Sequence, residues 1–196
     1  MCGRYELEAT VDDLEREFNA RVSDSLKITP RYNVAPSQVM PIVTKDKTLI
    51  LAHWGYAPSW AEERSPVINA RIEGLSEKAY YRGADRCLVP ANGFYEWQRA
   101  EDGKIPYFIH LPDRSLFAFA GVCNEGGYAI VTTEANEEVR EIHSRMPVIV
   151  APSSYDVWLG GETPPDTPTR LEFHEISTAV NSPRNDTPDL IQPMPK

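Results

Sequence analysis

The sequence predicts an α+β domain with a mainly antiparallel, barrel-like sheet core and a few peripheral helices. Three observations lead to this fold class. Short runs rich in β-branched and aromatic residues recur along the chain, separated by Gly, Pro and Asp. Helical patterns are few, and they do not alternate with strands in the rhythm of a doubly wound sheet. A chain of 196 residues can bury a core of its own, so we expect one domain over residues 1–196.

The first half of the chain is expected to hold a helix and a hairpin. A helix is predicted over Thr10–Ala20, because Thr10 can cap its start together with Asp13 three residues later. Residues 24–38 contain Pro30 and Pro36 and are expected to form a loop. The other elements expected here are strands at Val39–Thr44, Thr48–His53 and Val67–Ala70, a loop at Trp54–Pro66 and a helix at Glu73–Tyr81.

The second half is expected to be rich in strands. Strands are predicted at residues 87–90, 93–98, 105–111, 115–122 and 127–132, and again at Pro147–Val150 and Leu171–Ile176. Helices are predicted at Glu134–Ile142 and Ser153–Leu159. A flexible loop is expected over residues 160–169, and a Pro-rich tail from about residue 180.

The charge distribution limits the possible partners. A net charge of −9 and a pI near 5.0 exclude a bulk nucleic-acid coat or a basic membrane-surface domain, which bind through a cationic face. Residues 1–100 carry 13 basic and 14 acidic side chains, whereas residues 101–196 carry 7 and 15. An acidic body with a local Arg-lined cleft therefore agrees with the composition.

The sequence offers no signal for a membrane, a metal or a cofactor. No apolar run approaches the ~20 residues that span a bilayer, and the N-terminus lacks the apolar segment of a signal peptide. We therefore expect a cytoplasmic protein with no membrane partner. The three cysteines (Cys2, Cys87 and Cys123) have no CxxC spacing and the histidines are isolated, so we expect no disulfide framework, no metal and no cofactor.

Cys2 is the first candidate for chemistry. Cys is small enough that the initiator Met is usually removed, which would expose an amine with a pKa of roughly 7.7–8.0 beside a thiol of about 8.5. The amine can form an imine with an aldehyde, and the thiol can then close a five-membered thiazolidine. Alternatively, the thiolate attacks an acyl carbon with the amine as base. A chance residue at a frayed terminus remains the structural alternative.

Glu96 is the second candidate, in the strand-like segment Gly93–Trp97. Strand alternation places Phe94 and Glu96 on one face, and Tyr95 and Trp97 on the other. A Glu that projects from an apolar aromatic strand would have a raised pKa and could serve as a general acid or base. A Glu at a solvated strand edge is the alternative.

Further polar candidates lie near strand and helix ends. His143 follows a predicted helix and histidine titrates in the working pH range, although a lone His more often has a structural role. Asn69 offers both a donor and an acceptor. Three arginines lie within two residues of a candidate group and could hold phosphate or form ordinary surface ion pairs; they are Arg4, Arg71 and Arg145. The aromatic loops around residues 32–36 and 54–60 can stack on bases or plug the core.

Taken together, these segments occur in the order of a known family. They are Met1–Tyr5, Tyr32–Pro36, Trp54-Gly55, Asn69–Arg71, Gly93–Trp97, His143–Pro147 and the closing Asp189–Pro193. In this order they closely resemble the SOS-response-associated peptidase (SRAP) family, whose members form DNA–protein crosslinks at abasic sites. The resemblance runs from residue 2 to about residue 193.

The resemblance implies covalent capture of abasic sites in single-stranded DNA at replication forks. Cys2, exposed after Met1 removal, would end as a thiazolidine with C1′ of the open sugar. Glu96 would orient the amine and shuttle protons, His143 would assist ring opening, and Asn69 would position the Cys2 terminus and the sugar. The DNA contacts that the resemblance implies are Arg4, Arg71 and Arg145 at phosphates, with Asn33, Pro36, Trp54 and Trp97 beside them.

The resemblance also implies partners and side activities. Single-strand/double-strand junctions and replication-fork proteins are expected partners of a monomer that joins the nucleoid at damaged DNA. The same residues could release Met1 autocatalytically, and a lyase-like side activity is compatible with the chemistry.

The alternatives are a class II amidotransferase-like enzyme or thiol peptidase that uses Cys2, and a non-covalent reader of modified DNA. No glutamine-binding pattern or synthetase domain accompanies Cys2, which counts against the amidotransferase.

Overall fold

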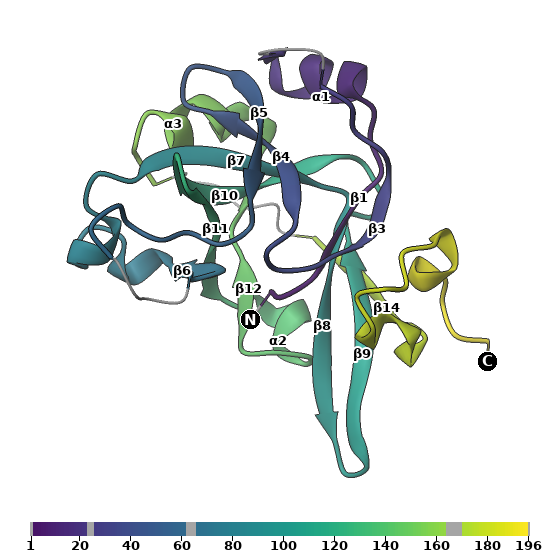
Figure 1. Cartoon of the computed structure of the whole chain (residues 1–196). Coiled ribbons are helices and arrows are strands. Elements are labelled where there is room, and N and C mark those ends of the chain that lie inside the picture. Colours follow the sequence, from purple (N-terminus) through teal and green to yellow (C-terminus); the bar gives the residue numbers. More distant parts are fainter. Residues whose placement is uncertain (1, 23–25, 62–65, 164–169, 196) are drawn as a thin grey trace.

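Two β-sheets form the centre of the computed structural model, which describes residues 2–22, 26–61, 66–163 and 170–195 (Figure 1). The first sheet contains β1 (Tyr5–Leu7), β3 (Arg31–Val34), β8 (Gly93–Ala100), β9 (Gly103–His110) and β14 (Glu172–Glu175). The second contains β2 (Arg21–Val22), β4 (Val39–Thr44), β5 (Thr48–His53), β6 (Asn69–Arg71), β7 (Asp85–Ala91), β10 (Phe117–Asn124), β11 (Gly127–Glu134), β12 (Arg145–Pro147) and β13 (Ile149–Val150).

The pairing of the strands is mainly antiparallel. The first sheet has the order β14-β9-β8-β1-β3, and the main path of the second is β12-β11-β10-β7-β4-β5-β2, with β13 beside β10 and β6 beside β11. Among the described strands, only β2 with β5 and β6 with β11 pair in parallel. Because the pairing leaves both sheets open at their ends, the prediction of a mostly-sheet single domain is confirmed, whereas barrel-like closure is not confirmed.

Few helices accompany the sheets. They are α1 (Val11–Phe18), α2 (Glu137–Arg140) and α3 (Tyr155–Leu159), with short 3-10 turns at Ile72–Gly74, Ala79–Tyr81, Pro152–Ser154, Thr178–Asn181 and Pro188–Ile191. The capping box predicted for α1 is present, because Thr10 Oγ1 accepts from Asp13 N and the Asp13 carboxylate accepts from Thr10 N. None of the described helices is long and apolar enough to cross a membrane.

Several elements differ from the predictions. The hairpin β4–β5 has the predicted bounds, but β3 lies within the expected loop 24–38, since its backbone pairs with the distant β1. The expected helix Glu73–Tyr81 is two separate 3-10 turns. The expected helix Glu134–Ile142 shortens to α2, because β11 continues through Glu134. Most of the expected loop 160–169 lies outside the described residues.

The pairing of β1 with β8 determines where the candidate residues meet. Tyr5 pairs with Phe94, so the N-terminal end of the chain runs antiparallel to the strand that carries Glu96. The two faces of β8 pack differently: Phe94 belongs to the main core, and Tyr95 belongs to a second cluster with C-terminal residues. The alternation predicted for this strand is therefore confirmed. The β8–β9 hairpin extends beyond the rest of the molecule (Figure 1).

One buried carboxylate gives the fold a testable pH dependence. Glu6 in β1 is fully buried, and neither carboxylate oxygen has a hydrogen-bond partner among the described residues. Burial raises the pKa of Glu6 to about 7, although Arg114, whose Nη2 lies 3.8 Å from Oε1, opposes this effect. The folded-state pKa thus exceeds the unfolded value of 4.5. The contribution of Glu6 to the free energy of unfolding is therefore complete below pH 4.5 and is lost as the pH rises through 7.

Replacing Glu6 with Gln is expected to leave the free energy of unfolding nearly unchanged at pH 4 and to raise it at pH 8 by up to about 3 kcal/mol. The amide keeps the shape of the protonated carboxyl and never ionises. Urea denaturation at both pH values measures the difference. A gain of equal size at pH 4 and pH 8 would contradict the assignment of the effect to ionisation.

Candidate active site

Cys2 lies in the interior, at the start of the chain segment that leads into β1. It is fully buried, and its thiol donates to the carbonyl oxygen of Arg4 at 3.6 Å. Burial raises the pKa of the Cys2 thiol well above its ordinary value, and the nearby Glu96 carboxylate adds to this effect. The thiol is therefore protonated near neutral pH, and it is a weak nucleophile in this state.

Glu96 projects from β8 toward the same interior region. Its side chain is only 2% exposed, and burial raises the pKa of its carboxyl above the ordinary value. The raised pKa agrees with the expectation for a Glu on an apolar strand. A carboxyl of this kind can hold a proton near neutral pH and exchange it with a bound group.

His143 follows α2 and precedes β12. Its Nδ1 accepts from the backbone N–H of Arg145 at 3.0 Å and lies 3.1 Å from the carbonyl oxygen of the same residue. A neutral ring accepts the first contact, and a protonated ring can donate in the second, so Nδ1 has a partner in both protonation states. This arrangement suits a group that gains and loses a proton during a reaction.

Asn69 holds the Cys2 backbone from the other sheet. It lies in β6, whose parallel pairing with β11 places it beside Ile130. Asn69 Nδ2 donates to the carbonyl oxygen of Cys2 at 2.8 Å. Its Oδ1 is buried and accepts no hydrogen bond from any described residue. A buried acceptor without a donor is costly, so this oxygen is suited to a donor that arrives later, such as an amine or a sugar hydroxyl.

The predicted phosphate arginines differ in their surroundings. Arg145 forms a two-point ion pair with Glu73, with Nη1–Oε1 at 2.6 Å and Nη2–Oε2 at 3.1 Å, and Nη2 also donates to the carbonyl of Thr132 at 2.8 Å. This contact lowers the pKa of the Glu73 carboxyl. Arg71 is exposed at the end of β6. Of the two, Arg71 therefore presents its side chain to solvent, and Arg145 is held within the protein.

Two predicted DNA contacts lie inside the protein. Asn33 and Trp54 are fully buried. The Asn33 amide is engaged with the C-terminal segment, and Trp54 Nε1 donates to the carbonyl of Ile68 at 2.9 Å. The position of Trp54 agrees with the core plug considered as an alternative, and the DNA contacts of both residues stay predictions. Pro36 and Trp97 are partly exposed, and their DNA contacts stay predictions.

A hollow lies beside His143. It has a volume of about 440 Å³ and is lined by side chains from β8, from β9 and from the segment that follows α2. Its lining includes Trp97, Gln98, Arg99, Lys104, Glu141 and His143. Gln98 Nε2 donates to the carbonyl of Glu141 at 2.8 Å and so connects β8 to the α2 end. Among the described residues, no group of three His, Cys, Asp or Glu gathers as metal ligands.

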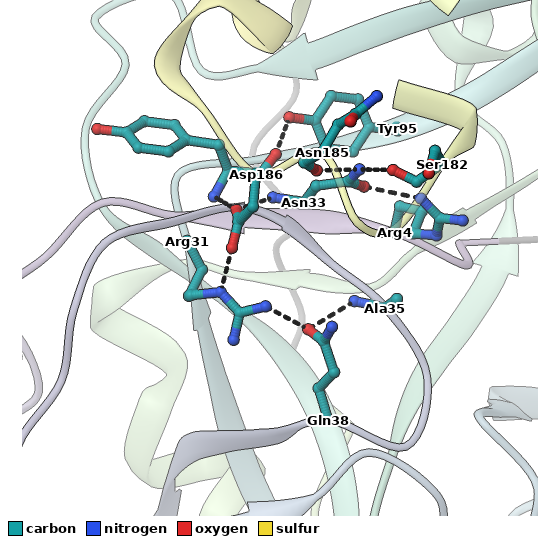
Figure 2. A network of polar contacts seen from close by, with 10 residues as sticks. Arg4, Arg31, Asn33, Ala35, Gln38, Tyr95, Ser182, Asn185 and Asp186 are labelled. Carbon is teal, nitrogen blue, oxygen red and sulfur yellow. Dashed lines mark hydrogen bonds and ion pairs between the residues drawn. The ribbon is translucent and has the colours of Figure 1, made fainter. Parts of the chain in front are cut away.

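A polar network that the sequence did not predict joins β3 to the C-terminal segment (Figure 2). Asp186 accepts from the backbone N–H groups of Tyr32 at 2.5 Å and Asn33 at 2.9 Å, and it pairs with Arg31. Arg31 also donates to Gln38 at 2.8 Å. The only sequence signal for this network is the resemblance of the nearby closing segment, which carries no information about its contacts.

Comparison with known proteins supports the resemblance. The family model described as "SOS response associated peptidase (SRAP)" matches residues 1–183. The "Abasic site processing protein YoqW" of Bacillus subtilis is 38% identical over 98% of this chain and 99% of its own length. The "Abasic site processing protein HMCES" of Gallus gallus is 31% identical over 84% of this chain and 66% of its own.

The fold also has a solved counterpart. A crystal structure of a protein from Bacteroides thetaiotaomicron matches with a TM-score of 0.81 and 24% identity, over 98% of this chain and 100% of that one. This structural likeness supports the fold, and the sequence matches support the family. The chain belongs to the SOS response associated peptidase (SRAP) family.

Proposed function

We propose that this protein captures abasic sites in single-stranded DNA covalently, through Cys2 after removal of Met1. The names of its relatives support abasic-site DNA as the target. The observation that carries the mechanism is the buried Cys2, held by Asn69 and near enough to the Glu96 carboxyl to feel its charge, with His143 within electrostatic reach of Glu96. These four residues come from separate parts of the sequence.

The proposed reaction joins one aldehyde and one aminothiol. The Cys2 amine attacks C1′ of the ring-open sugar and forms a C–N bond, and the resulting hydroxyl leaves as water to give an imine. The thiol then adds across the C=N bond, so that sulfur bonds to C1′ and the thiol proton goes to nitrogen. The product is a thiazolidine, and the net loss is one water. Glu96 supplies the proton to the departing hydroxyl, and His143 exchanges a proton with the sugar ring oxygen during ring opening.

The raised thiol pKa favours this order of events. A thiol peptidase or a class II amidotransferase begins with attack by a thiolate. The burial of Cys2 and the neighbouring Glu96 carboxylate disfavour the thiolate. Imine formation requires only the amine at the start, and the sulfur acts later as a positioned neighbour. The environment of Cys2 therefore supports aldehyde capture over the two acyl-transfer alternatives.

The proposal also covers the state of the protein, its DNA targets and its side reactions. We propose a single 1–196 domain that acts as a monomer in the cytoplasm and at the nucleoid, on single strands and on junctions, with replication-fork proteins as partners. The same residues would release Met1, and an imine that escapes the thiol could eliminate the adjoining phosphate as a lyase-like side reaction. Arg71 is proposed to contact a phosphate, together with Arg145 where DNA displaces Glu73, and with the part of the Arg4 side chain that remains exposed while its contacts to Asn33 and Val180 persist.

Cys2→Ala is expected to abolish the stable adduct. The protein is incubated with a single-stranded oligonucleotide that carries one abasic site, and the products are separated on a denaturing gel. Wild type should give a heat-stable band whose intact mass equals the protein without Met1 plus the DNA minus one water. The Cys2→Ala variant keeps an N-terminal amine after Met1 removal, so it should give a band only when borohydride reduces the imine.

The controls separate the alternatives. A non-covalent reader would bind the same DNA in both variants without a heat-stable band in either. A thiol peptidase would cleave peptides repeatedly and form no DNA adduct. If wild type forms no adduct, or if Cys2→Ala forms the heat-stable adduct equally well, the proposed function is wrong. Retention of Met1 in the active protein would also contradict it, since the amine would be blocked.

A further inference from the structure

The C-terminal strap, defined as residues 176–191, packs on the face of the first sheet opposite Glu96. The second hydrophobic cluster contains Tyr95 and Phe108 from the sheet and four residues of the strap, Ile176, Val180, Leu190 and Ile191. Tyr95 is the direct neighbour of Glu96 in β8. The strap includes part of the closing segment that resembles the family, and the mechanism above gives this segment no task.

Asn33 fastens the strap to β3. Its Nδ2 lies within hydrogen-bonding distance of three strap carbonyl oxygens, those of Val180 at 3.1 Å, Ser182 at 3.1 Å and Asn185 at 2.8 Å. Asp186 adds contacts to the backbone of the same strand (Figure 2). Because Asn33 is fully buried, water cannot replace these contacts.

Arg4 continues the network to the reactive cysteine. Arg4 Nη1 donates to Asn33 Oδ1 and to the carbonyl of Val180, each at 2.8 Å. The backbone carbonyl of Arg4 makes a separate set of contacts. It accepts from the Cys2 thiol at 3.6 Å and from the backbone N–H of Tyr95 at 3.1 Å. The strap is thus connected through Asn33 and Arg4 to the thiol and to the strand of Glu96.

We propose that Asn33 is a positioning residue for the Cys2 reaction, which rests on the function proposed above. Asn33 fixes the Arg4 side chain against the strap, and the Arg4 carbonyl then fixes the thiol relative to β8. Removing the Asn33 side chain takes one acceptor, Asn33 Oδ1, away from Arg4 and leaves its guanidinium on the strap carbonyls of Val180 and Asn181, so that the start of the chain is held less firmly to β3. Small displacements of reacting groups reduce rates strongly, whereas DNA binding by the exposed surface should change little.

The test separates rate from affinity. Single-turnover crosslinking to abasic single-stranded DNA gives a maximal rate at saturating DNA and a half-saturating DNA concentration. Asn33→Ala is expected to lower the maximal rate by about tenfold or more and to change the half-saturating concentration by less than about twofold. Asp186→Asn, a milder change in the same network, is expected to lower the maximal rate by a smaller factor and remains informative if Asn33→Ala does not fold.

The matched control is Ser177→Ala. Ser177 Oγ accepts from the backbone N–H of Ala179 within the strap. Among the described residues it forms no hydrogen bond to β1 or β3, so its loss weakens the strap and leaves the hydrogen bonds of Arg4 in place. This variant should keep the wild-type maximal rate. The inference is wrong if both network variants keep the wild-type rate, or if Ser177→Ala lowers it equally.

Two further outcomes are decisive. A higher half-saturating concentration with an unchanged maximal rate would show that Asn33 and Arg4 serve DNA contact, and would overturn the positioning role. Absence of an adduct with the wild-type protein would instead refute the proposed function itself. The failure of the inference and the failure of the function therefore give different results.

Discussion

Replacing Glu96 with Gln is expected to slow formation of the DNA adduct by roughly 10²- to 10⁴-fold at neutral pH, the range typical of general acid–base catalysis. The amide retains the size of the carboxyl but cannot exchange a proton with the departing hydroxyl. DNA affinity should be nearly unchanged, because the Glu96 side chain is only 2% exposed and does not form the outer surface. Single-turnover crosslinking at saturating DNA measures the rate.

The pH dependence makes this prediction more specific. Burial raises the pKa of the Glu96 carboxyl, so its protonated form persists to higher pH than an exposed Glu allows. If Glu96 acts as the acid, the wild-type rate should fall as the pH rises through this raised pKa. The Glu96→Gln variant should lack this alkaline decline, while the decline at low pH, caused by protonation of the Cys2 amine, should persist in both.

A suitable control lies at the turn of the same hairpin. Glu101 is exposed between β8 and β9, so Glu101→Gln removes the same charge away from the buried site. This variant should keep both the wild-type rate and the wild-type pH profile. A Glu96→Gln variant that crosslinks at the wild-type rate would exclude Glu96 as the acid and would move that role to His143.

Local patterns in the sequence predicted the elements that depend on local contacts. The helix α1 is determined by its Thr10 cap and apolar stripe, and the β4–β5 hairpin by alternating residues around a short turn. β3 was missed because its partner β1 is far away in sequence and its own segment contains a Pro at each end. The expected Glu73–Tyr81 helix failed for a related reason, since Tyr80 and Tyr81 pack against Tyr56.

The site could be predicted residue by residue only through the resemblance. Strand alternation predicted the face on which Glu96 lies, but it left open whether that side chain is buried or at a solvated strand edge. The contact between Asn69 and Cys2 follows from the parallel pairing of β6 with β11, for which the sequence has no local signal. The burial of Asn33 and Trp54 could not be predicted from the sequence either. A polar or aromatic residue in a loop-like segment gives the same sequence pattern whether it contacts a ligand or fills the interior.

Gly127→Ala is expected to cause the largest loss of stability, because Gly127 starts β11 where two backbone segments approach closely. Its φ of +150° is rarely adopted by residues with a side chain, and an added Cβ would lie 2.4 Å from the Gly55 oxygen and 2.6 Å from the His53 oxygen. These are backbone atoms, and Gly55 N donates to the Tyr128 carbonyl at 2.8 Å, so neither side can move without breaking the pairing.

The expected loss in the free energy of unfolding for Gly127→Ala is about 4 kcal/mol, at the upper end of single-residue effects. Gly103→Ala is the matched control: its φ is +138°, but an added Cβ would meet nothing within 4 Å. This control should lose about 1 kcal/mol from backbone strain alone. Chemical denaturation of both variants measures the contrast, and equal losses would contradict the steric explanation. β11 also pairs with β6, which contains Asn69, and with β12, which follows His143, so the Gly127→Ala variant should lose crosslinking activity at temperatures where the Gly103→Ala variant retains it.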